Sequence, residues 1–168
     1  MSVSMYDLSV TRFNQMMRNL IDILNKAKAH CEAKSIDPSV LPGCRVIADM
    51  LPLSKQVQIV SDQAKGCVAR LAGQKPPSYE DTETTLDQLI ARINKTIIYL
   101  EGFTPEQVNG SEEKEIVLEF PNMTLNMNGT KYLLGFTTPN VYFHVTTAYN
   151  ILRANGVDLG KRDFIGQI

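Results

Sequence analysis

Residues 139–156 read PNVYFHVTTAYNILRANG, a pattern that predicts a helix ending at Gly156. Two polar residues, Asn140 and His144, stand among apolar neighbours such as Val141 and Val145. Residues four apart lie on the same face of a helix. The pair therefore indicates either a functional site or a hydrogen-bonded network inside the core.

Three earlier segments, at 5–34, 52–72 and 82–101, predict long helices with one face in the core. In each of them apolar residues recur three and four positions apart. Gly73 and Gly102 mark the ends of the second and third helices. The apolar stripes are Phe13, Met17, Leu20, Leu24, Ala27 and Cys31; Leu53, Val57, Val60, Ala64, Cys67 or Val68, and Leu71; Leu86, Leu89 or Ile90, Ile93, Ile97 and Leu100.

The period changes to two over 115–127, where apolar and polar residues alternate on both sides of Pro121-Asn122. This alternation predicts a β-hairpin with one apolar face. A last helix is expected over 131–154, with a kink or a restart near Thr138, because Pro139 lacks a backbone N–H. The alternative is a helix that begins at Pro139 with Thr138 as its N-cap.

Together these segments predict an all-α fold, an antiparallel four-helix bundle packed at about 20°, with a small β-hairpin between the third and fourth helices. The chain of 168 residues is long enough for one domain with a single core, and we expect one domain over residues 1–168.

Composition argues against several classes of partner. The net charge is −1 and no Lys/Arg block is present, so neither nucleic acid nor an anionic membrane is expected. No apolar run approaches the ~20 residues that span a bilayer. The three cysteines, Cys31, Cys44 and Cys67, show no metal-binding spacing. Without a visible signal peptide they favour free thiols in a reducing compartment, which predicts a cytoplasmic protein.

Four blocks of the sequence carry a family resemblance. They are MYDLSV at 5–10, MLPLSKQVQIVSDQAKG at 50–66, HVTTAYNILRANGV at 144–157 and LGKRDF at 159–164. With the order of helices and hairpin, they make the chain similar to the DinB/YfiT-like superfamily. Within it, the chain resembles an uncharacterised family known only as a domain of unknown function.

The resemblance implies a divalent metal held by three histidines, one on the second helix and two in an HxxxH on the last long helix. The second histidine of that motif matches His144, and the first matches Asn140. An ungapped alignment places the remaining ligand near Gln58. Amides thus replace two of the three imidazoles, and carboxamides are poorer ligands for zinc or nickel.

The candidate ligand-binding residues are Gln58, Asp62, Asn140 and His144, which would line a pocket between the second and fourth helices. His144 is also the candidate catalytic base and metal ligand, because imidazole titrates near neutral pH. Asp62 could orient His144 or bind the metal. The alternatives are a solvated face for the polar run around Gln58, and repair of the helix at Pro139 by Asn140.

Three functions follow. The first is a small-molecule binding protein with a degenerate metal site. The second, which the resemblance suggests, is a metal-dependent or thiol-dependent transferase or isomerase that uses His144. The third is a homodimeric structural or interaction protein.

Overall fold

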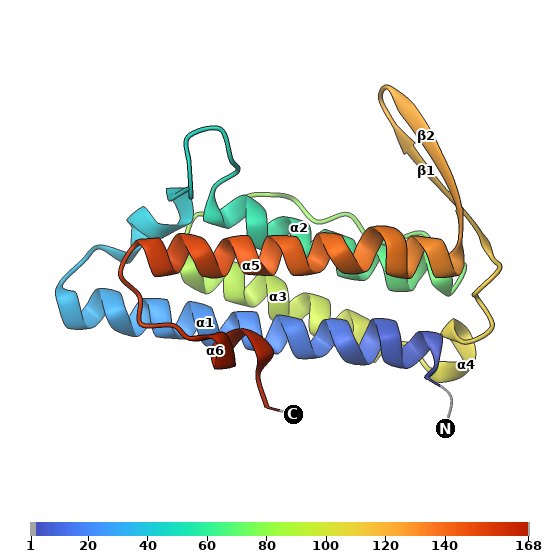
Figure 1. The fold of residues 1–168 in the computed structure, drawn as a ribbon, viewed down its shortest axis with the longest axis horizontal. Coiled ribbons are helices and arrows are strands. Elements are labelled where there is room, and N and C mark those ends of the chain that lie inside the picture. The colour runs from blue at the N-terminus through green and yellow to red at the C-terminus, as the bar shows by residue number, and fades with distance from the viewer. Residues whose placement is uncertain (1–2, 168) are drawn as a thin grey trace.

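The computed structural model describes residues 3–167, and most of them are helical. Four long helices lie side by side, and a two-stranded antiparallel sheet extends from one end of them (Figure 1). The long elements are η1 (Asp7–Thr11) and α1 (Arg12–Lys34), α2 (Leu53–Leu71), α3 (Leu86–Glu101), and η3 (Lys131–Thr137) with α5 (Thr138–Ala154). The short helices are η2 (Pro38–Gly43), α4 (Pro105–Val108) and α6 (Lys161–Ile165).

The helices do not all alternate in direction. Contacts of α2 with the last long helix pair late residues with early ones. Arg70 meets Tyr132 of η3, and Gln56 meets His144 of α5, so α2 is antiparallel to η3 and α5. The direction of α2 and α3 is the same, because the linker of residues 72–85 carries the chain back along α2 before α3 begins (Figure 1). The wholly antiparallel arrangement expected from the sequence is therefore wrong for α2 and α3.

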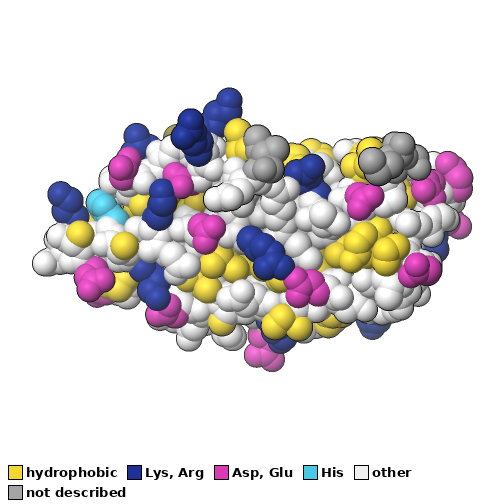
Figure 2. Space-filling model, turned by 90° about the horizontal axis from the view of Figure 1, so that it is seen from below, with side chains coloured by type: hydrophobic (Ala, Val, Ile, Leu, Met, Phe, Trp, Pro, Cys, Tyr) yellow, Lys and Arg dark blue, Asp and Glu magenta, His cyan; other side chains and the backbone are white. Residues whose placement is uncertain are grey.

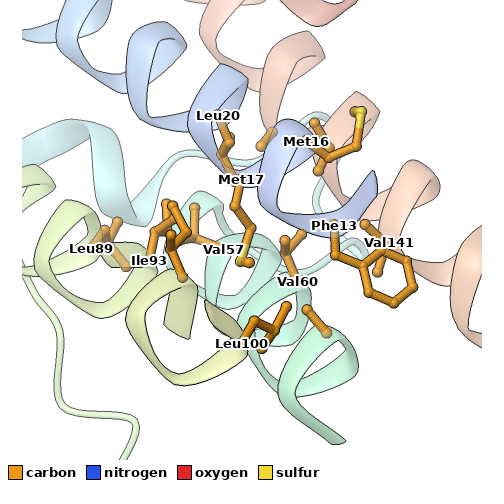
Figure 3. Packing of buried hydrophobic residues seen from close by; sticks show 14 of the residues in the cluster. Phe13, Met16, Met17, Leu20, Val57, Val60, Leu89, Ile93, Leu100 and Val141 are labelled. Atoms are coloured by element: carbon orange, nitrogen blue, oxygen red, sulfur yellow. The ribbon is translucent and has the colours of Figure 1, made fainter. Parts of the chain in front are cut away.

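The core lies between the four long helices, where the predicted stripes meet. Phe13 of α1 packs beside Val60 of α2 and Val141 of α5 (Figure 3), and the side chain of Phe13 is fully buried. Met17 and Ile93 bring α1 and α3 into the same cluster. Burial of such side chains removes apolar surface from water, and this stabilises the arrangement.

The start of α3 is later than expected, at Leu86. Thr85 is extended and accepts a hydrogen bond from the Gln88 backbone N–H, while the Gln88 side chain accepts from the Thr85 backbone N–H. This reciprocal capping box fixes the first turn. Residues 72–85 ahead of it contain no helix or strand.

The last long helix passes through Pro139 without a restart. Thr138 is helical and makes no capping hydrogen bond, so the alternative in which the helix begins at Pro139 is wrong. The break instead takes the form of the π-helical segment η3, just before the proline. Wider π-helical turns are frequent at functional sites.

The hairpin pairs β1 (Glu115–Phe120) with β2 (Met123–Asn128), as the alternation predicted. Ile116 and Leu118 are buried against the helices. Figure 1 shows that the far end of the hairpin reaches beyond the helices. Phe120 and Met123, which flank the turn, are exposed, and so is Val117 in the middle of β1.

Over residues 3–167, no helix combines the length and the apolar character needed to cross a membrane. The face seen from below carries Lys/Arg and Asp/Glu side chains interspersed with one another (Figure 2).

Candidate functional site

His144 lies on α5 and contacts α2 through one short hydrogen bond. Its Nδ1 is 2.7 Å from Oε1 of Gln56, a residue that is 1% exposed. The Nε2 of Gln56 in turn donates to the carbonyl oxygen of Leu51 at 2.9 Å. The chain of contacts therefore runs from the backbone before α2 to the imidazole on α5.

This chain of contacts fixes the protonation of the imidazole. Because the amide nitrogen of Gln56 donates to a carbonyl, the amide oxygen faces His144 and accepts a hydrogen bond from the ring. The hydrogen of neutral His144 is therefore on Nδ1, which leaves the lone pair on Nε2. Burial lowers the pKa of His144 below its ordinary value of 6.5, so the ring is neutral at pH 7.

We expect nitrogen-detected NMR to show His144 with a protonated Nδ1 and an unprotonated Nε2 at pH 8. In a Gln56→Leu variant this preference should disappear, because the acceptor is gone. The same spectra should give a titration midpoint below 6.5 in the wild-type protein. A dominant Nε2-protonated ring would contradict the arrangement of the Gln56 amide.

Asn140 makes a side-chain hydrogen bond to the turn that precedes it. Its Nδ2 donates to the carbonyl oxygen of Phe136 at 2.7 Å, one turn earlier on the same helix. This bond uses one hydrogen of the amide group that was expected from the sequence to contact a ligand.

Gln58 and Asp62 lie on another face of α2 from Gln56. Side chains two positions apart point to different sides of a helix, so Gln56 faces α5 whereas Gln58 faces the linker ahead of α3. Nε2 of Gln58 donates to Glu83 at 2.8 Å. Oδ1 of Asp62 accepts a hydrogen bond from Nη2 of Arg92 at 2.9 Å. The structure thus does not bring the four predicted site residues together.

Gln58 and Asp62 instead contact an ion-pair network around Arg92, which was not predicted from the sequence. The Arg92 side chain is 2% exposed, and its guanidinium contacts Asp62, Asp81 at 3.0 Å and Glu83 at 3.1 Å. It also donates to the backbone carbonyl of Glu80. Buried charges need such partners. The network ties the linker to α2 and α3.

The residues at His144 do not fit the metal that the resemblance implies. Among residues 3–167, no three His, Cys, Asp or Glu side chains gather closely enough to hold a metal ion. Around His144 the donors are one imidazole and the carboxamides of Gln56 and Asn140, and each amide is already in a hydrogen bond. Zinc and nickel favour imidazole, thiolate or carboxylate ligands over such a set.

A cavity of about 800 Å³ lies between α2, β1 and η3. Asp62, predicted as a site residue, lines it, whereas Gln58, Asn140 and His144 do not. The lining residues are Asp62, Gln63, Lys65, Gly66, Arg70, Gly73, Gln74, Lys75, Pro76, Lys114, Glu115, Ile116, Val117, Leu118, Glu119, Phe120, Tyr132 and Phe136.

Two other hollows lie along the helices. The hollow beside α5, of about 530 Å³, includes Phe143 but not His144 in its lining. The hollow between α1 and α6, of about 1280 Å³, contains Arg18 and Glu101, which pair with each other. In the cavity at β1, Lys65 pairs with Asp62, whereas Arg70 and Lys114 have no carboxylate partner within the described chain.

The helices and the hairpin define a DinB-like protein. A crystal structure described as a DinB family member protein from Shewanella denitrificans is 42% identical to this chain. The match covers 97% of this chain and 92% of that one, with a TM-score of 0.89. Residues 5–165 match the model of the family described as Domain of unknown function (DUF1993), and the chain belongs to this family. The resemblance read from the sequence is thereby confirmed. A comparison with curated proteins gives no match.

Proposed function

We propose that this DinB-like protein binds a small organic molecule in the cavity between α2, β1 and η3. The observation that carries the proposal is the cavity itself, whose volume of about 800 Å³ suits a small ligand. It is a different place from the pocket expected from the sequence, because Asp62 is the one residue of the four expected that lines it. In this proposal the His144–Gln56 pair is a degenerate metal site outside the ligand pocket.

The walls of the cavity support this function. One wall is apolar, with Ile116, Leu118 and the rings of Tyr132 and Phe136. The two rings stack with their centroids 6.1 Å apart. The polar face of α2 from Asp62 to Arg70 also lines the cavity and meets Tyr132 at Arg70. Apolar walls with a few convergent polar groups are typical of ligand sites.

We expect the fluorescent probe 8-anilinonaphthalene-1-sulfonate to bind the folded protein saturably, with one site per chain. A Val117→Trp variant should weaken this binding at least fivefold, because Val117 lines the cavity and a larger side chain would narrow it. The measurement is a fluorescence titration of each protein.

The matched control is Ile98→Trp on the outer face of α3, where Ile98 is 70% exposed and lines none of the hollows described above. This variant should bind the probe as the wild type does. Near-UV circular dichroism shows that each protein keeps its packed core, because the probe also binds loosened states. Equal binding by the Val117→Trp variant, or no saturable site in the wild type, would contradict the proposal.

A further inference from the structure

The guanidinium of Arg70 is held in place at one nitrogen and open at the others. Its Nη1 donates to the carbonyl oxygen of Gly66 at 3.0 Å and to the hydroxyl oxygen of Tyr132 at 3.1 Å. Burial raises the pKa of Tyr132 to about 12, so this hydroxyl stays neutral. Nε and Nη2 have no partner within residues 3–167 and are not buried. Those two nitrogens form the edge that binds a carboxylate bidentately.

Gly66 makes this placement of Arg70 possible. A Cβ at position 66 would be 2.6 Å from Nη1 of Arg70, well inside van der Waals contact. No other atom outside Arg70 lies closer than 3.9 Å to that Cβ, and the nearest of them is the Tyr132 hydroxyl. The backbone and the core would thus accept a methyl group here, whereas the guanidinium would have to move. The absence of a side chain at Gly66 therefore permits the observed position of Arg70, whereas the helix itself would also accept alanine there.

The second cation of the cavity is Lys114. Its Nζ donates to the carbonyl oxygen of Leu71, the last residue of α2, at 2.6 Å. A lysine at this place interacts favourably with the C-terminal end of a helix. The ammonium has three donors, and this contact uses one of them. Lys114 thus adds positive charge to the wall that Arg70 occupies.

The charge balance of the lining indicates the charge of the ligand. Four cations, Lys65, Arg70, Lys75 and Lys114, face three carboxylates, Asp62, Glu115 and Glu119. The excess of one positive charge matches a monoanion better than a phosphate dianion, which the carboxylates would repel.

We infer that the ligand is an amphipathic monocarboxylate, whose two oxygens pair with Nε and Nη2 of Arg70 and whose aromatic or aliphatic body lies against Tyr132, Phe136 and β1. This inference rests on the proposed binding function and adds the chemical class of the ligand. The bidentate pair supplies orientation, and the apolar wall supplies area that leaves water on binding.

The test uses 3-phenylpropionate as the probe, with its neutral isostere 3-phenylpropanamide, in calorimetric titrations at pH 7. The carboxylate should bind the wild type at least tenfold more tightly than the amide. The Arg70→Gln variant should bind the carboxylate at least tenfold more weakly than the wild type does. Gly66→Ala should do the same while leaving thermal stability unchanged or higher, because alanine favours a helix interior over glycine. Lys131→Gln, an exposed change outside the cavity lining, is the charge control and should bind as the wild type does.

Each failure has its own meaning. Equal affinity for carboxylate and amide, or full carboxylate affinity in the Arg70→Gln variant, would overturn the monocarboxylate and leave the cavity as a neutral-ligand site. Tighter binding of phenyl phosphate than of 3-phenylpropionate would overturn the charge argument. If the wild type bound neither 3-phenylpropionate nor its amide and also had no anilinonaphthalene site, the proposed function itself would be overturned.

Discussion

Replacing Arg92 by methionine should lower the free energy of unfolding by about 3 kcal/mol, the lower end of the range for breaking a buried ion pair. Methionine approximates the length of the arginine stem but leaves Asp62, Asp81 and Glu83 close together without their shared cation. The lower end applies because Asp62 and Asp81 are 42% and 37% exposed, so that water screens part of their charge. Urea unfolding monitored by circular dichroism measures the loss.

The same substitution at an exposed ion pair is the control. Arg18 pairs with Glu101 on the surface, and both side chains are about half exposed. Arg18→Met should therefore cost less than about 1 kcal/mol. Equal losses in the two variants would show that the Arg92 network does not hold the linker.

The effect of Arg92→Met should also depend on pH. Burial alone would raise the pKa values of Asp81 and Glu83. A hydrogen bond from Lys55 lowers the pKa of Asp81, a hydrogen bond from Gln58 lowers that of Glu83, and Arg92 lowers both, so that both pKa values lie below their ordinary values. A carboxyl group with a lowered pKa contributes stability above its unfolded-state pKa and loses that contribution as the pH falls. The difference between wild type and variant should therefore be largest near pH 7 and should narrow below about pH 4.

Gly129→Ala should destabilise the protein by about 3 kcal/mol, at the upper end of the usual cost of overpacking. A Cβ at Gly129 would be 1.9 Å from the backbone oxygen of Ser111 and 3.2 Å from Cδ2 of Leu71. The first of these is backbone and cannot rotate away. Relief requires the segment between β2 and η3 to move away from Ser111, which precedes β1, so the anilinonaphthalene site should weaken as well.

Gly135→Ala is the matched control for this steric argument. It lies in η3, shortly after Gly129, but its Cβ would meet only Cγ of Lys131, at an ordinary 3.6 Å. Alanine is favoured over glycine in helices by about 0.5–1 kcal/mol, so this variant should be unchanged or slightly more stable. A Gly129→Ala variant as stable as the Gly135→Ala variant would contradict the close approach of Ser111.

Most of the fold could be predicted because its elements repeat locally. Stripes such as Phe13, Met17 and Leu20 define helix faces without knowledge of their partners. The hairpin followed from the change of period at 115. The shared direction of α2 and α3 could not be predicted in this way, since the path of the linker is set by Arg92 and its partners in the folded state.

The candidate site was harder to predict because its residues come from distant segments. Arg70 and Tyr132 are 62 positions apart, and no local pattern joins them. An ungapped alignment placed Gln58 beside His144, but the residue that contacts His144 is Gln56. A shift of two positions along a helix moves a side chain to a different face of that helix. One signal was present for the network: Arg92 and Thr96 both fall at stripe spacing within α3, and both are buried.

The most direct test of the ligand cavity is a set of intermolecular nuclear Overhauser effects between 3-phenylpropionate and methyl-labelled protein. The proposal predicts contacts from the phenyl protons to the methyl groups of Ile116 and Leu118, which line the cavity at β1. Contacts to the methyl groups of Val46 and Met50, in the hollow beside α5, with none to Ile116 or Leu118, would contradict it.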